Sequence, residues 1–177
     1  MEEKIIISGA GGQGIMLLGK ILAEVAMREG KFTTWLPSYG AEVRGGSSFC
    51  MVTISDEEIS SPYIDKADTL IVFNQISLER FLPFLRPKGL LLVNSSLAHL
   101  NPEKKSITIF SFPFTEMAIK LKDIKVANMI ALGVYLKKKN ILKVDTVFKT
   151  LKEITPLEKE DILNINLKAI EEGMRIG

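Results

Sequence analysis

Cysteine and histidine are almost absent from this sequence, and their scarcity limits the chemistry that the chain can perform by itself. Its 177 residues include one cysteine, Cys50, and one histidine, His99. A lone cysteine excludes an internal disulfide, a cysteine-ligated iron–sulfur cluster and a cysteine-rich zinc site. A lone histidine argues against a multi-histidine metal site and a Ser–His catalytic pair. We therefore predict no metal site and no catalytic residue in this chain alone, and we expect Cys50 to pack within the sheet.

Excess charge and long apolar runs are also lacking. The net charge at pH 7 is +2, from 23 basic and 21 acidic residues, which excludes a broad positive field for nucleic acid. The longest apolar stretch, residues 126–136, is too short to span a bilayer and contains Asn128. Residues 1–4 show no secretory signal. We therefore expect one globular domain over residues 1–177, in the cytoplasm, contacting neither nucleic acid nor a membrane.

A glycine-rich turn lies between a predicted strand and a predicted helix near the start of the chain. The apolar run Ile5–Ile7 is typical of a buried parallel strand, and helical periodicity begins at Ile15. The glycines between them have the spacing GxGxxG of a dinucleotide-type turn, which lets a ligand approach the backbone and the positive end of a helix dipole. The alternative is that the glycines serve only to pack the helix on the sheet. The candidate ligand-binding residues are Gly9, Gly11, Gly12, Gln13 and Gly14.

The order of the predicted elements indicates an α/β protein. We expect a Rossmann-like open, mostly parallel sheet flanked by helices, followed by a helical C-terminal part. Small polar residues follow several of the apolar strands: Ser8, Ser38, Asn74, Asn94 and Ser111. In open α/β sheets the ligand crevice lies beyond the carboxyl ends of the strands. We therefore expect a crevice there, with Asn74 and Asn94 offering hydrogen bonds on its floor.

A second glycine-rich stretch follows the predicted strand at residues 32–36. It carries Tyr39, Gly40 and the opposite charges Glu42 and Arg44. An arginine offers a rigid fork for a carboxylate or a phosphate, so this loop is a second candidate ligand contact together with Ser38. The alternative is that Glu42 and Arg44 pair with each other and stiffen the loop. The next strand, at residues 48–54, follows too soon for a helical crossover and is expected to run antiparallel.

The same region disfavours a nicotinamide coenzyme. A nicotinamide-binding unit carries an acidic residue about 20 residues beyond its glycines, where it holds the ribose hydroxyls. This chain has Leu36, Pro37 and Ser38 at the end of the second predicted strand. We therefore treat a free-standing nucleotide-dependent oxidoreductase as the weaker interpretation.

Several helix boundaries can also be predicted. Ser77 is expected to cap a short helix and Asp145 a later one, while residues 155–158 read as a capping box that opens the last helix. The helix at residues 126–136 is apolar on nearly all sides, so both its faces must be covered. Its second face is a candidate contact for another subunit.

Taken together, these stretches resemble the gamma subunit of 2-oxoacid:ferredoxin oxidoreductases, nearest to the 2-oxoglutarate and branched-chain (ketoisovalerate) types. The likeness extends in unbroken order over nearly the whole chain. Ala41 and Val43 stand where that family has Pro and Met. The matching segments are residues 9–14, 38–46, 61–62, 67–68, 73–75, 77–78, Phe81, Pro83, 94–97 and 126–129.

The resemblance implies a reaction and a set of partners. The reaction is the oxidative decarboxylation of a 2-oxoacid, here expected to be 2-oxoglutarate, with coenzyme A, to give an acyl-CoA, CO2 and reduced ferredoxin. Thiamine diphosphate, Mg2+ and the iron–sulfur clusters are implied on alpha, beta and ferredoxin-like delta subunits. This chain would line the active site and help to bind coenzyme A through its glycine turn. Arg44, steered by Glu42, would face the substrate carboxylate, a coenzyme A phosphate or a partner subunit. A pure assembly subunit, whose glycines only pack, is the remaining alternative.

Overall fold

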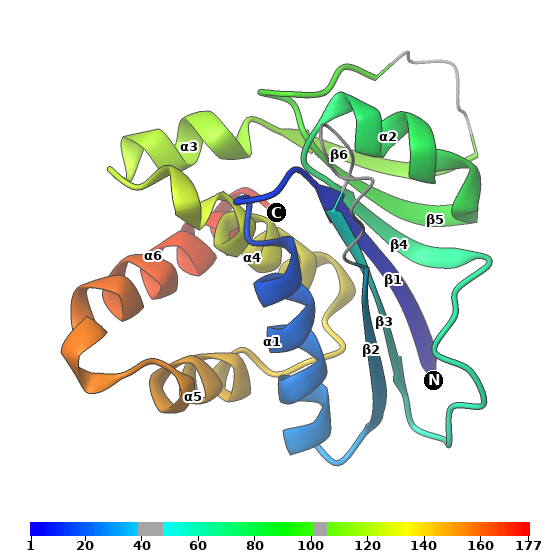
Figure 1. Ribbon diagram of the computed structural model, residues 1–177, viewed down its shortest axis with the longest axis horizontal. Helices are drawn as coiled ribbons and strands as arrows, with labels where there is room; N and C mark the ends of the chain where they lie inside the picture. Colours follow the sequence, from blue (N-terminus) through cyan, green and yellow to red (C-terminus); the bar gives the residue numbers. More distant parts are fainter. Residues whose placement is uncertain (39–47, 101–105) are drawn as a thin grey trace.

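The computed structural model describes residues 1–38, 48–100 and 106–177. Within them the strands form one six-stranded sheet in the order β2-β3-β1-β4-β5-β6 (Figure 1). β3 runs antiparallel to both of its neighbours, whereas β1, β4, β5 and β6 pair in parallel. The predicted α/β class and the antiparallel third strand are thus confirmed. The strands are β1 Glu2–Gly9, β2 Phe32–Ser38, β3 Ser48–Ser55, β4 Ala67–Val72, β5 Leu85–Asn94 and β6 Thr108–Phe112.

Helices cover both faces of the sheet, which explains the continuous apolar run of β1. Ile5 and Ile7 point into the core beneath α1 and α4, and Ile6 points into the core beneath α2. Figure 1 shows α1, α4, α5 and α6 on one side of the sheet and α2 on the other. The helices are α1 Ile15–Arg28, α2 Gln75–Phe81, α3 Phe114–Lys120, α4 Ala127–Lys139, α5 Val144–Ile154 and α6 Glu160–Ile176; short 3₁₀ turns are η2 Leu82–Phe84, η3 Ile124–Val126 and η4 Leu157–Lys159.

Two neighbouring parallel strands, β1 and β4, are followed by helices that lie on opposite faces of the sheet. β1 leads through the glycine turn into α1, while β4, beside it, leads into α2 on the other face. A crevice opens beyond the carboxyl ends of parallel strands at such a switch point. The fold therefore places the glycine turn at the position where open α/β sheets bind ligands.

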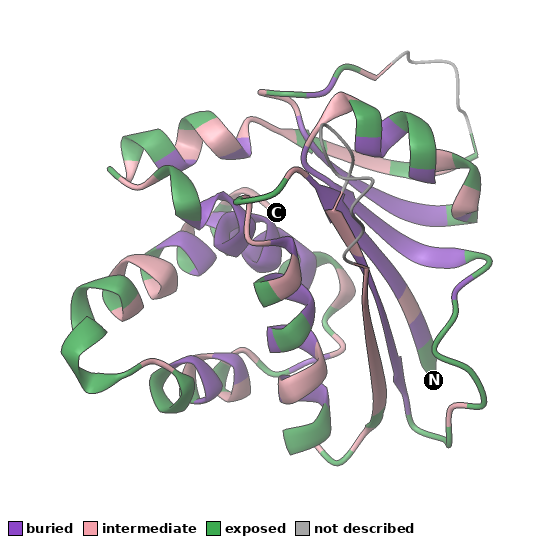
Figure 2. Cartoon of the chain, in the orientation of Figure 1, coloured by how far each residue is buried: buried purple, intermediate pink, exposed green. Residues whose placement is uncertain are grey.

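The apolar helix α4 is covered by its own chain. All its residues from Ala127 to Leu136 are buried (Figure 2), and α6 packs directly against it. Gly133 and Gly173 lie at the crossing, where a Cβ on either glycine would collide with a backbone carbonyl of the other helix. The second face of α4 was a candidate contact for another subunit, and this interpretation was wrong because α6 already covers that face.

Three predicted helix caps were also wrong. The side chain of Asn74, not Ser77, caps α2 by accepting the N–H of Ser77. Lys143 occupies the N-cap position of α5, so Asp145 lies within its first turn. Thr155 ends α5, and Pro156 precedes η4 without a side-chain cap. Asn74 supplies the cap of α2 in place of Ser77, whereas the residues at the N-cap positions of α5 and η4 give no side-chain cap.

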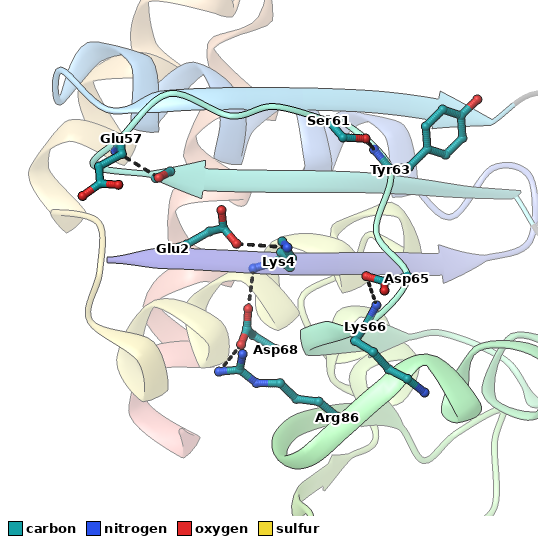
Figure 3. A network of polar contacts seen from close by, with 10 residues as sticks. Glu2, Lys4, Glu57, Ser61, Tyr63, Asp65, Lys66, Asp68 and Arg86 are labelled. Carbon is teal, nitrogen blue, oxygen red and sulfur yellow. Dashed lines mark hydrogen bonds and ion pairs between the residues drawn. The ribbon is translucent and has the colours of Figure 1, made fainter.

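Ion pairs tie the amino edge of the sheet together, at the end opposite the glycine turn. Buried Asp68 accepts the N–H of Lys4 at 2.8 Å and pairs with Arg86 (Figure 3). Buried Glu3 lies 2.8 Å from the Lys139 Nζ, and burial raises the pKa of its carboxyl. These groups join β1, β4, β5 and α4 and leave the carboxyl edge free of this network.

Candidate functional site

The glycine turn is closed by its own side chain and backbone. Gln13 Oε1 accepts the N–H of Ala10 at 2.7 Å, and the Gln13 N–H donates to the Ala10 carbonyl at 3.3 Å. Gly12 and Gly14 have φ angles of 86° and 72°, the left-handed region that favours glycine. Gly14 is the N-cap of α1 and gives no side-chain cap to the helix. Gln13 therefore fixes the turn that the sequence predicted and leaves the α1 amides uncapped.

Of the four glycines in the turn, Gly9, Gly12 and Gly14 are required by the fold itself. A Cβ on Gly9 would lie 2.5 Å from Gln13 Oε1 and 2.9 Å from Phe73 Cβ, and one on Gly14 would overlap the Asn128 side chain. Gly12 needs its positive φ. Gly11 differs from all of these, because it is exposed, has no positive φ, and a Cβ there would meet no atom within 4 Å. The described part of the protein gives no reason for glycine at position 11.

Asn128 joins the turn to the start of α4. Its Nδ2 donates to the Gly14 carbonyl at 3.1 Å, and the same carbonyl accepts the N–H of Leu18 at 3.0 Å. The Asn128 side chain is buried, with a relative exposure of 2%. The first turn of α1 contains no acidic residue, so nothing there offsets the positive end of the helix dipole. The geometry suits an anion at the turn.

The two predicted asparagines support neighbouring helices. Asn74 caps α2 and is half-buried. Asn94 is fully buried: its Nδ2 donates to the Phe73 carbonyl at 3.3 Å and to Thr115 Oγ1 at 2.8 Å, and its Oδ1 accepts the Thr115 N–H. The hydrogen-bonding groups of Asn94 are thus used within the protein, at the junction of β4, β5 and α3. Both residues lie at the predicted edge, but Asn94 offers no free group to a ligand.

The second glycine-rich loop lies mostly outside the described residues. Ser38 is half-buried at the end of β2, opposite Phe49 of β3, and so lies on the same edge of the sheet as Gly9. Tyr39, Gly40, Glu42 and Arg44 fall between residues 39 and 47 and are not described. Ser8, next to the turn, donates to Ser77 Oγ at 2.9 Å and joins β1 to α2.

Sequence reasoning missed the part played by Asn128. Its signals were a polar side chain at the start of an otherwise apolar helix and a place in the matching segment 126–129, and neither indicated a contact with the glycine turn. Cys50 is buried as predicted, and burial raises the pKa of its thiol to about 12. Among the described residues, no three His, Cys, Asp or Glu side chains gather as metal ligands, and none of the helices searched there could cross a membrane.

Comparison with known proteins decides the family. The family of pyruvate ferredoxin/flavodoxin oxidoreductases matches residues 4–176. The chain belongs to this family. The resemblance to 2-oxoacid:ferredoxin oxidoreductase gamma subunits is thereby confirmed, and relatives within the family are subunits of oxidoreductase complexes.

Individual relatives differ in length. Subunit KorC of the 2-oxoglutarate synthase of Methanocaldococcus jannaschii is 33% identical over 99% of this chain and 94% of its own length. Ketoisovalerate oxidoreductase subunit VorA of Methanothermobacter marburgensis is 36% identical over 97% of this chain, but the match spans only 36% of VorA. This chain thus corresponds to about a third of the longer VorA relatives.

Two solved structures share the fold. The gamma subunit of a keto/oxoacid ferredoxin oxidoreductase from Geobacter sulfurreducens is 31% identical, with a TM-score of 0.83 over 98% of this chain and 96% of that one. The 2-oxoglutarate:ferredoxin oxidoreductase from Magnetococcus marinus has a TM-score of 0.88 over 98% of this chain and 30% of that one. Its identity is 23%, so this likeness concerns the fold alone.

Proposed function

We propose that this chain is the gamma subunit of a multisubunit 2-oxoacid:ferredoxin oxidoreductase, in which it lines the active site and helps to bind coenzyme A. The observation that carries the ligand-binding role is Gly11. It is the motif glycine that the described protein does not need, and it lies in the open beside an uncapped helix start. A glycine at a position where the fold leaves room for a side chain fits a backbone that a ligand approaches closely.

The chain's own contribution is to bind and position. In this proposal the backbone amides at the start of α1, which receive no side-chain cap from Gly14, and the helix dipole hold a phosphate of coenzyme A. Gln13 and Asn128 fix the turn that presents these amides. Asn94 shapes the crevice by holding α3 rather than by contacting the ligand, whereas Asn74, whose Oδ1 caps α2, remains a proposed ligand contact on the crevice floor.

The loop beyond Ser38 completes the wall of the site in this proposal. Tyr39 and Gly40 shape it, and Arg44, steered by Glu42, contacts an anionic group of the substrate, of coenzyme A or of a partner subunit. Arg44→Ala separates this role from a loop-stiffening one. We expect this variant to lose turnover, coenzyme A affinity or assembly. If all three stay at wild-type values, Arg44 is not a residue of the site.

The redox and carbanion chemistry belongs to groups on the partners. With one cysteine in its whole sequence, the chain cannot ligate an iron–sulfur cluster by itself. We therefore assign thiamine diphosphate, Mg2+ and the clusters to alpha, beta and ferredoxin-like delta subunits, with ferredoxin as the electron acceptor. A cytoplasmic location and a single domain over residues 1–177 belong to the same proposal.

The proposed 2-oxoacid is 2-oxoglutarate. Support comes from KorC, a 2-oxoglutarate synthase subunit whose whole length this chain nearly matches. VorA, a ketoisovalerate oxidoreductase subunit, is similar over only a third of its length. Ketoisovalerate is accordingly the second candidate.

Purification of the chain from its native source tests the proposal. We expect subunits carrying thiamine diphosphate and iron–sulfur clusters to accompany it, and dye reduction to require both a 2-oxoacid and coenzyme A. A panel with 2-oxoglutarate, ketoisovalerate and pyruvate should show the highest kcat/KM for 2-oxoglutarate. A chain that purifies alone and binds a nucleotide by itself would contradict the proposal.

A further inference from the structure

Arg80 of α2 differs from the other arginines that the structure describes. Those three form ion pairs with carboxylates: Arg28, Arg86 and Arg175. Arg80 is exposed and forms no ion pair with any described residue. Its guanidinium lies over the rings of Phe49 and Phe81, 5.2 and 5.1 Å from their centroids. Stacking of this kind orients the guanidinium and leaves its N–H edge available to an anion.

The stack is built from two elements on the α2 face of the sheet. The Phe49 ring, on β3, lies 4.8 Å from that of Phe81 on α2, at an interplanar angle of 52°. Phe49 pairs with Ser8 at the end of β1, so the stack lies near the carboxyl edge of the sheet. Arg80 is therefore held beside the candidate site but on the opposite face from α1.

Two large side chains are exposed on the same face of the sheet as Arg80, which is the face that α2 covers. Ile76, one helical turn before Arg80 on the same side of α2, is 54% exposed. Tyr63 is 73% exposed and belongs to the segment that crosses this face of the sheet, and its ring projects beyond that segment (Figure 3). The next residue, Ile64, donates its N–H to Met51 Sδ at 3.4 Å, and Met51 lies two residues along β3 from Phe49.

We propose that Tyr63, Ile76 and Arg80, together called the Arg80 surface, form a docking site for a partner subunit that presents an Asp or Glu among apolar side chains. Tyrosine, arginine and large apolar residues are enriched at the centres of protein interfaces. The carboxylate follows from charge complementarity with a guanidinium that has no carboxylate partner among the described residues. This inference rests on the proposed role as one subunit of a complex.

A protein fits this surface better than a free anion does. A small anion would engage Arg80 and leave Tyr63 and Ile76 in water, whereas a polypeptide covers all three. The longer relatives support this choice, since the matching domain makes up only 36% of VorA and is continuous there with the rest of that chain. Further polypeptide thus adjoins this domain in those proteins.

The test measures binding between this chain and the partner subunits with which it purifies, by biolayer interferometry, for wild type and Arg80→Glu. Reversing a charge that is desolvated at an interface should weaken association at least about thirtyfold, mainly through faster dissociation. Arg80→Lys, which keeps the charge but not the planar fork, should weaken it about threefold to tenfold. Lys168→Glu, an exposed charge reversal on α6, is the matched control and should bind as wild type does.

Other outcomes of the binding experiment would overturn either the docking inference or the proposed function. If Arg80→Glu binds the partners as tightly as wild type, the docking inference is overturned. If association is unchanged but KM for the 2-oxoacid or for coenzyme A rises, Arg80 holds a small anion instead, which also overturns it. If the wild-type chain purifies without any partner subunit, the proposed function is wrong, and the docking inference that rests on it is wrong as well. Thermal unfolding of isolated Arg80→Glu excludes misfolding, and Ile76→Asp, which needs no change at Arg80, should weaken association independently.

Discussion

Asn128 of α4 donates a hydrogen bond to the carbonyl of Gly14, 114 residues earlier in the chain. That carbonyl also begins the hydrogen-bond ladder of α1, through Leu18. The contact makes the glycine turn depend on α4, and α4 depends on α6 for its cover. The C-terminal helices thus hold in place the turn to which we assign coenzyme A.

Asn128→Ala should therefore affect both stability and coenzyme A. Removing the amide leaves the Gly14 carbonyl with one donor, and we expect unfolding free energy to fall by about 1–2 kcal/mol in urea titrations. In the assembled enzyme, KM for coenzyme A should rise several-fold because the turn is less well fixed. Asn164→Ala, an exposed asparagine on α6, should change neither quantity. If Asn128→Ala leaves both quantities unchanged, as the control should, the glycine turn does not depend on α4.

The crossing of α4 and α6 gives a prediction about stability alone. Gly133→Ala and Gly173→Ala each place a methyl group against a backbone carbonyl of the other helix. We expect each to lower the free energy of unfolding by about 3 kcal/mol, despite the better helix propensity of alanine. The double variant should lose less than the sum, since both methyl groups force the same helices apart. If both single variants unfold at the same urea concentration as the wild type, the two helices do not cross as closely as the structure shows.

Cys50 should be inert in the folded protein and should link stability to alkaline pH. Burial raises the pKa of its thiol from 9.0 to about 12, so at pH 8 the thiolate fraction falls about a thousandfold. Iodoacetamide should modify Cys50 rapidly only in denaturant. Modification of the native protein at the rate of a free thiol would show that the thiol is accessible.

The sign of the linkage follows from proton binding. The folded state keeps the Cys50 proton to a higher pH than the unfolded state does, so this stabilisation is complete below about pH 9 and is lost as the pH rises toward 12. Between pH 8 and pH 10 the wild type should lose about 1.4 kcal/mol more than Cys50→Ala. Equal losses in urea titrations at the two pH values would contradict the raised pKa.

The sequence predicted the elements well where the signal is local. Ile5–Ile7 marked a strand buried on both faces, and the GxGxxG spacing located the turn and the start of α1. Three local capping patterns nevertheless failed, and the other failure in the fold depended on partners distant in sequence. The cover of α4 required the pairing of Gly133 with Gly173, 40 residues away, which helical periodicity cannot reveal.

The same limit applies to the site. Asn94 looked available because it follows a strand, but Thr115 and the Phe73 carbonyl occupy its amide. Arg80 had no distinguishing local pattern, because its orientation depends on Phe49 of another element. Side-chain availability is set by tertiary neighbours, whereas the edge on which a residue lies follows from the order of strands and helices.

Gly11→Ala, assayed in the assembled enzyme, tests the proposed coenzyme A contact most directly. Since a Cβ at position 11 meets no atom within 4 Å, we expect the free energy of unfolding to change by less than about 1 kcal/mol. KM for coenzyme A should nevertheless rise about tenfold, with the subunit composition unchanged, because the added methyl group displaces the ligand. Gly14→Ala, strained by its positive φ and its contact with Asn128, should instead destabilise the fold. If Gly11→Ala leaves both stability and KM for coenzyme A at wild-type values, the glycine turn serves packing only and the chain is a scaffold.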